Sequence, residues 1–146
     1  MRTNIRRGLI AATAAVVFTV TNVAPALADS SSGNCSSLGY SATGRANYTT
    51  GGTGVRYISS FSWTINGQSG STKNDVIIEL KRDDTLRPDP VLYTWSTGSA
   101  RNGDGSHTPP YALEMPVLWR VYARYHFIFD RNNLGDPECY ARTSNF

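Results

Sequence analysis

Residues 117–130 read Val-Leu-Trp-Arg-Val-Tyr-Ala-Arg-Tyr-His-Phe-Ile-Phe-Asp, and this stretch decides the fold class. Apolar side chains alternate with mostly polar ones, and this period of two is typical of a β-strand with one buried face. The apolar face comprises Val117, Trp119, Val121, Ala123, Tyr125, Phe127 and Phe129. Since a usual strand has about 5–6 residues, we expect a bulge, or a bend that lets the stretch serve two sheets.

The same period of two recurs elsewhere in the chain, and no segment shows helical periodicity over a useful length. The pair Asn66-Gly67 predicts a hairpin-type turn, and residues 98–110 are rich in turn formers. We expect strands over 40–48, 55–65, 76–81, 91–95 and 139–146. The sequence therefore predicts an all-β fold, a small antiparallel β-sandwich of immunoglobulin-like architecture.

The first 28 residues have the parts of an export signal in the right order. A cationic start, which includes Arg2 and Arg6-Arg7, precedes an apolar segment that ends in the cleavage pattern Ala26-Leu27-Ala28. We favour general secretion, and Arg6-Arg7 leaves twin-arginine export as the alternative. Because few of the cationic residues are Lys, a GC-rich bacterial source is favoured. The product is expected to be extracellular.

The signal defines the expected domain organisation. Residues 1–28 are expected to be removed, residues 29–34 to form a flexible tail, and residues 35–146 to form a single domain. No apolar segment after residue 28 reaches the length of about 20 residues that a membrane helix needs. Three of the fourteen Lys and Arg lie in the signal, so the rest balance the eleven Asp and Glu. A neutral chain does not draw in polyanions, and neither a membrane nor a nucleic-acid partner is expected.

The two cysteines, Cys35 and Cys139, lie near the two ends of the predicted domain. An oxidising compartment favours their pairing. The sequence thus predicts one disulfide that joins the N-terminal and C-terminal strands. Closing so long a loop should stabilise the fold by roughly 3–5 kcal/mol.

The outer face of residues 117–130 is the most unusual predicted surface, because its polar side chains all point the same way. Alternate residues lie about 7 Å apart along a strand, so the row presents two guanidinium groups and an imidazole to an anion or an acidic partner. A solvated face without a ligand is the alternative that the same pattern allows. The candidate binding residues are Arg120, Tyr122, Arg124, His126 and, beside Pro109-Pro110, Tyr111.

The leading functional hypothesis is a non-enzymatic, protein-binding β-sandwich, which inhibits a secreted enzyme or serves as an adaptor subunit of an extracellular complex such as a toxin. It rests on the missing Gly-x-Ser-x-Gly and glycine-rich phosphate motifs. It also rests on the stiff, proline-containing segments 87–90 and 106–111. The partner would be another secreted or cell-surface protein.

Two other hypotheses stay open. A carbohydrate- or cell-wall-binding module would use Tyr111 and Tyr122 as a platform for sugar rings. A small secreted nuclease would use His126 as the acid, Arg124 and Arg120 as phosphate contacts, and a glutamate such as Glu79 or Glu114 as the base. The extended spacing of Arg120 and His126, about 20 Å along one strand, speaks against the nuclease.

No cofactor and no metal are expected. Residues 101–110 resemble the start of a calcium loop but lack an acidic first ligand, and residues 130–136 have Leu134 where a ligand belongs. Both are interpreted as turns. The three tryptophans fall on apolar faces and are expected in the core: Trp63, Trp95 and Trp119.

Overall fold

The computed structural model describes residues 27–68, 73–132 and 134–146. Within these residues the chain forms strands and no helix, so no helix there is long and apolar enough to cross a membrane. The all-β prediction is confirmed. The strands are β1 (Leu27–Ser37), β2 (Tyr40–Thr50), β3 (Val55–Asn66), β4 (Asn74–Arg82), β5 (Val91–Ala100), β6 (Gly103–His107), β7 (Leu113–Pro116), β8 (Val121–Ile128) and β9 (Glu138–Arg142).

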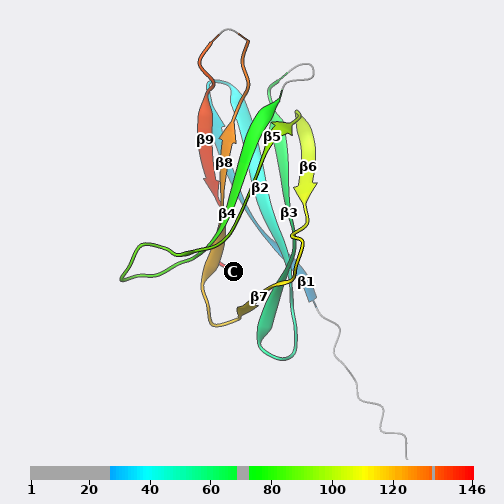
Figure 1. Ribbon diagram of the computed structural model, residues 1–146, viewed down its shortest axis with the longest axis vertical. Coiled ribbons are helices and arrows are strands. Elements are labelled where there is room, and N and C mark those ends of the chain that lie inside the picture. The colour runs from blue at the N-terminus through cyan, green and yellow to red at the C-terminus, as the bar shows by residue number, and fades with distance from the viewer. Residues whose placement is uncertain (1–26, 69–72, 133) are drawn as a thin grey trace, which may run out of the picture.

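Two antiparallel sheets pack face to face, as Figure 1 shows. One sheet has the order β1-β2-β3-β6, and β7 pairs with β3 further along the same edge. The other sheet has the order β5-β4-β8-β9. The predicted antiparallel β-sandwich is therefore confirmed.

The core lies between the sheets and is built from the alternation seen in the sequence. In β8 the inward side chains of Val121, Ala123, Tyr125 and Phe127 are fully buried. They pack in one cluster with apolar side chains of β2, β3 and β4. Burying apolar surface of this kind is the dominant stabilising term of a small domain.

β3 departs from the predicted alternation at one point. Ser60 pairs with Asn47 and Ile58 pairs with Tyr48, so Ser59 is an extra residue, a β-bulge. The bulge shifts the phase of the alternation by one residue. As a result Ile58 is buried in the core and Tyr57 is not.

The β1–β9 side of the sandwich is held together covalently. Cys35 and Cys139 form the predicted disulfide between β1 and β9, and the Ser31 hydroxyl donates to the Ser144 carbonyl oxygen at 2.9 Å. The prediction of a flexible tail over residues 29–34 is wrong, because these residues belong to β1 and pair with β2 along its whole length. The predicted signal lies outside the described residues, apart from Leu27 and Ala28.

The long strand predicted over residues 117–130 is shorter in the structure, where β8 covers Val121–Ile128. β7 ends at Pro116, and residues 117–120 form a turn in which the Trp119 amide donates to the Pro116 carbonyl oxygen at 3.0 Å. This turn carries the chain from one sheet to the other, but it lies before β8 and β7 lies outside the stretch, so the expected bulge or bend within a strand that serves two sheets is not found. Trp119 therefore leaves the core, and the expectation that it is buried there is wrong: its side chain is 36% exposed.

Two turn predictions are also wrong. Asn66-Gly67 ends β3 but does not make a hairpin, because β3 and β4 belong to opposite sheets. Residues 103–107, interpreted as part of a turn, form β6. Glycine makes this strand possible: a Cβ on Gly105 would lie 2.4 Å from the ring of Trp63, so only glycine lets β6 approach β3 so closely.

Aromatic side chains fill the side of the sandwich between β5 and β6. The Trp95 ring stacks on His107 with centroids 4.1 Å apart and tilts against Trp63 at 5.6 Å. The Tyr93 hydroxyl and His107 Nε2 are 2.6 Å apart, and burial lowers the pKa of His107. Trp63 is in the core as expected, and Trp95 is packed against it while partly buried.

Candidate functional site

The first two residues of the predicted row, Arg120 and Tyr122, both contact the loop between β4 and β5, and Arg120 stays exposed whereas Tyr122 is buried. Tyr122 is only 5% exposed, so its predicted role as a wet platform is wrong. Its ring lies under Arg142, whose Cζ is 3.8 Å from the ring centroid. Its hydroxyl donates to Asp89 Oδ2 at 2.6 Å. Arg120 Nη2 lies 3.2 Å from Asp83 Oδ2, so both residues hold the loop between β4 and β5.

The contact between Tyr122 and Asp89 changes the pKa values of both side chains. The hydrogen bond from Tyr122, helped by the Asp84 backbone amide, lowers the pKa of Asp89. Burial, reinforced by the bond to Asp89, raises the pKa of Tyr122 to about 12. The neutral phenol and the ionised carboxylate are thus the forms that the fold favours across the neutral range.

Ionisation of Tyr122 should weaken the fold at alkaline pH. Because its pKa in the folded protein lies above the ordinary value of 10.0, the stabilisation from this site is fully present below pH 10 and is lost as the pH rises through about 12. Tyr122→Phe should therefore be less stable than wild type at pH 7, and the difference should shrink between pH 10 and pH 11.5. The urea unfolding midpoints of both proteins at each pH measure this difference in stability. A difference independent of pH would contradict the assignment.

The other two residues of the row, Arg124 and His126, each contact a carboxylate. Arg124 Nη2 lies 2.6 Å from Glu79 Oε2. His126 Nε2 lies 2.6 Å from Glu138 Oε2, and its ring stacks on Tyr140. Glu79, Arg124, His126 and Tyr140 line a hollow of about 190 Å³ on the outer face of the β5-β4-β8-β9 sheet.

This hollow contains the residue types of the nuclease hypothesis, but Arg124 and His126 each already have a carboxylate partner. A phosphate would have to displace Glu79 from Arg124 before it could be clamped. Glu114, the other suggested base, lies on β7 in the opposite sheet. The arrangement therefore gives little support to phosphate chemistry.

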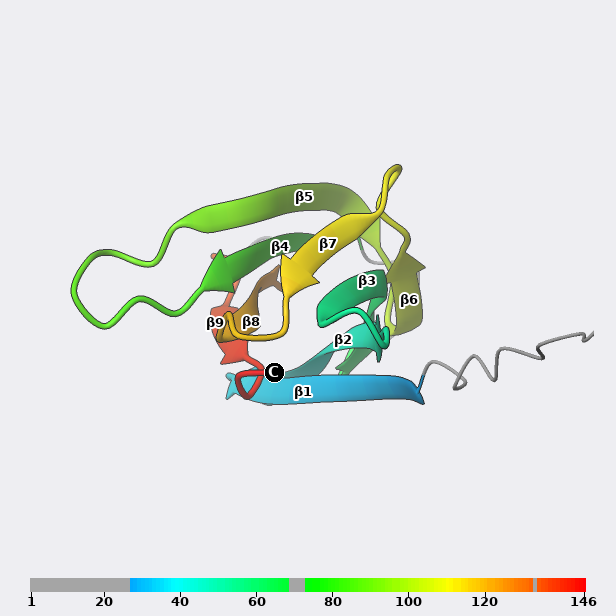
Figure 2. The same ribbon diagram turned by 90° about the horizontal axis from the view of Figure 1, so that it is seen from below.

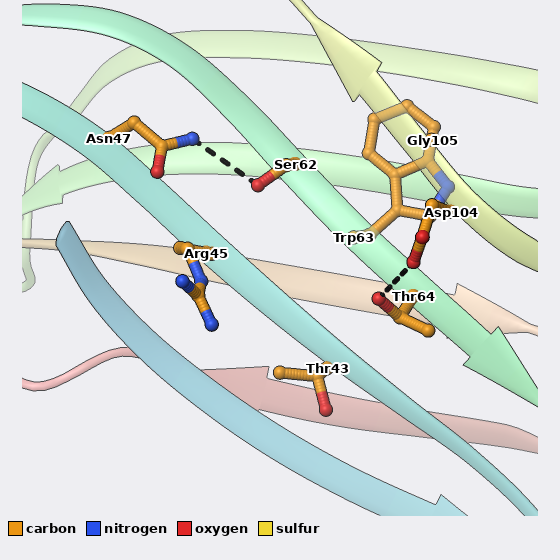
Figure 3. A pocket seen from close by; sticks show the side chains of 8 residues that line it. All are labelled: Thr43, Arg45, Asn47, Ser62, Trp63, Thr64, Asp104 and Gly105. Atoms are coloured by element: carbon orange, nitrogen blue, oxygen red, sulfur yellow. Dashed lines mark hydrogen bonds between the residues drawn. The ribbon is translucent and has the colours of Figure 1, made fainter.

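The outer face of the other sheet carries short polar side chains (Figure 3). The Asn47 amide donates to the Ser62 hydroxyl at 3.2 Å, and the Thr64 hydroxyl donates to Asp104 Oδ1 at 2.6 Å. A shallow hollow of about 280 Å³ lies over these residues, with Arg45 at one side. No large aromatic ring in the described part of this face is exposed, since Trp63 is buried. The face thus lacks the stacking platform that sugar binding would use.

Exposed apolar side chains gather at the end of the molecule where β4 joins β5 and β7 joins β8. A groove of about 390 Å³ lies there between β5 and β7, with Leu80, Leu92, Leu113 and Met115 among its lining residues, and the exposed rings of Tyr111 and Trp119 also line it. We call this surface the apolar end. Its exposed members are Leu86, Val91, Tyr111, Leu118 and Trp119.

The site residues predicted from the sequence thus lie on different surfaces of the molecule. Tyr111 lies at the rim of the groove and meets Tyr93 edge to face, whereas Tyr122 lies on the outer face of the β5-β4-β8-β9 sheet. The proposed sugar platform of these two rings is therefore not assembled. The apolar end was missed because its exposed residues come from three separate loops and from the start of β5. The one signal in the sequence was apolar side chains within segments otherwise rich in Pro, Asp and Arg.

The described residues hold no group of three or more His, Cys, Asp and Glu side chains placed to bind a metal ion. Comparison with family models, with curated proteins and with solved structures finds no match to this chain.

Proposed function

We propose that this protein is a secreted, non-enzymatic β-sandwich that binds another secreted or cell-surface protein through its apolar end. The observation that supports this function is the apolar groove lined by two exposed aromatic side chains, Tyr111 and Trp119, with the exposed Leu118 next to Trp119 in the chain. Soluble proteins rarely expose large contiguous apolar patches unless they serve as interaction sites. Exposed aromatic residues such as Tyr111 and Trp119 are the type of anchor that dominates protein interfaces.

The scaffold suits this role because it presents the apolar end rigidly. The Arg82 guanidinium lies 5.0 Å from the Trp119 ring centroid. The Asp83 amide donates to the Arg120 carbonyl oxygen at 2.8 Å, which ties the two loops together. A surface that is already ordered loses little conformational entropy on binding. Inhibition of a secreted enzyme and assembly into an extracellular complex both need such a surface.

The test is affinity capture from the native culture fluid with two matched variants of the mature chain. Wild type should retain a partner in stoichiometric amount, and Leu118→Ser with Trp119→Ala should lose it. The control is Leu134→Ser, because Leu134 is 61% exposed but lies in the β8–β9 loop at the other end of the molecule. Circular dichroism checks that all three proteins are folded.

Recovery of wild type only as a free monomer would overturn the proposal. Equal retention of a partner by all three proteins would also overturn it, since binding would then not depend on the apolar end.

A further inference from the structure

The loop over residues 83–90, which we call the arm, projects from the sandwich between β4 and β5 (Figure 2). Its base is closed by a hydrogen bond from the Arg82 amide to the Pro90 carbonyl oxygen at 3.1 Å. The chain bends over residues 85–87. Leu86 therefore stands at the apex of a convex loop, and its side chain is 91% exposed.

Two aspartates brace the arm from inside. The Asp84 amide donates to Asp89 Oδ1 at 3.0 Å, which joins the two sides of the loop. The Leu86 amide donates to Asp84 Oδ1 at 3.2 Å, which holds the apex. Asp89 also accepts the hydrogen bond from Tyr122, so the brace is connected to β8. Pro88 and Pro90 restrict the remaining backbone angles.

A braced convex loop with an apolar side chain at its apex is complementary to a substrate cleft. Serine endopeptidases bind the side chain before the scissile bond in a specificity pocket, which is an apolar slot in chymotrypsin and acidic in trypsin. The Leu86 side chain fits an apolar pocket. Because Arg87 is followed by Pro88, the bond after Leu86 rather than the bond after Arg87 suits the catalytic serine.

We propose that the arm occupies the substrate cleft of a secreted serine endopeptidase with an apolar specificity pocket, and that Leu86 is the specificity residue. This inference rests on the proposed protein-binding function and names the class of partner. The bracing contacts are the feature that would make the arm an inhibitor of the endopeptidase and not merely a substrate. If water hydrolyses the bond after Leu86, forming a carboxylate on Leu86 and an amine on Arg87, the contacts of Asp84 and Asp89 still hold both new ends together.

The test measures inhibition constants of the mature protein against subtilisin, chymotrypsin and trypsin. Wild type should inhibit subtilisin or chymotrypsin and not trypsin. Leu86→Gly should raise the inhibition constant by at least about 30-fold, the effect of a hot-spot residue. Leu86→Lys should lose inhibition of the apolar-pocket enzymes and gain inhibition of trypsin. Leu134→Ala truncates another exposed leucine side chain, at the far end of the molecule, and should leave the inhibition constant unchanged.

Three results would overturn the inference. They are absence of inhibition of all three enzymes, inhibition that Leu86→Gly leaves intact, and rapid cleavage of the arm with release of active enzyme. The first result combined with partner capture that needs Leu118 and Trp119 would refute the endopeptidase and leave the proposed protein-binding function standing. Failure of both assays would refute both.

Discussion

Replacing both cysteines, Cys35→Ser with Cys139→Ser, is expected to lower the free energy of unfolding by about 2–5 kcal/mol. The disulfide closes a loop of 104 residues, so it restricts the unfolded chain over nearly all of the described domain. A domain of this size has a total stability of about 5–15 kcal/mol, so the loss is a large share of it. Urea unfolding followed by tryptophan fluorescence measures the difference.

The folded state itself should change little, because β1 keeps its pairing with β2 and β9 keeps its pairing with β8. Far-ultraviolet circular dichroism of the double variant should therefore match that of wild type at low denaturant concentration. Two findings on wild type would contradict the prediction. They are free thiols in the denatured protein and a disulfide-linked dimer on a non-reducing gel.

Gly44→Ala is expected to destabilise the protein by about 1–3 kcal/mol, the usual cost of overpacking a core. A Cβ at Gly44 would lie 2.3–2.5 Å from three ring atoms of Tyr125. That ring has little room to move, because it is fully buried and its hydroxyl donates to the Arg45 carbonyl oxygen at 2.7 Å. Urea unfolding midpoints of the variant and wild type test this prediction.

Gly52→Ala is the matched control, because a Cβ at Gly52 would have no heavy atom within 4 Å and the backbone there is not left-handed. This variant should be as stable as wild type, or slightly more stable because alanine restricts the unfolded chain. Equal losses in the two variants would mean that the close approach of Tyr125 is not the cause.

The row of Arg120, Tyr122, Arg124 and His126 shows how a correct pattern can leave the contacts of its side chains undetermined. Alternation correctly placed Tyr122, Arg124 and His126 on the outer side of β8. It could not show that Asp83 and Asp89 would come from the β4–β5 loop to engage Arg120 and Tyr122. Nor could it show that Glu79 and Glu138, on neighbouring strands, would pair with Arg124 and His126.

The sequence by itself determined the all-β class, the buried face of the strongest strands and the disulfide between the ends. Each of these depends on local physics: the period of two follows from the pleat of a strand, and the pairing of two lone cysteines follows from an oxidising compartment. Tyr125 and Phe127 could be assigned to the core on this basis alone.

Only the tertiary structure decided which strands share a sheet, where the long stretch turns, and which loops meet at the apolar end. Gly103–His107 became a strand because Trp63 packs against Gly105, a contact between residues far apart in the chain. The loops that carry Leu86 and Leu118 are joined because the Asp83 amide donates a hydrogen bond to the Arg120 carbonyl oxygen. Such long-range contacts produce no periodic pattern in the sequence, because the residues next to either partner in the chain do not determine which distant residue it contacts.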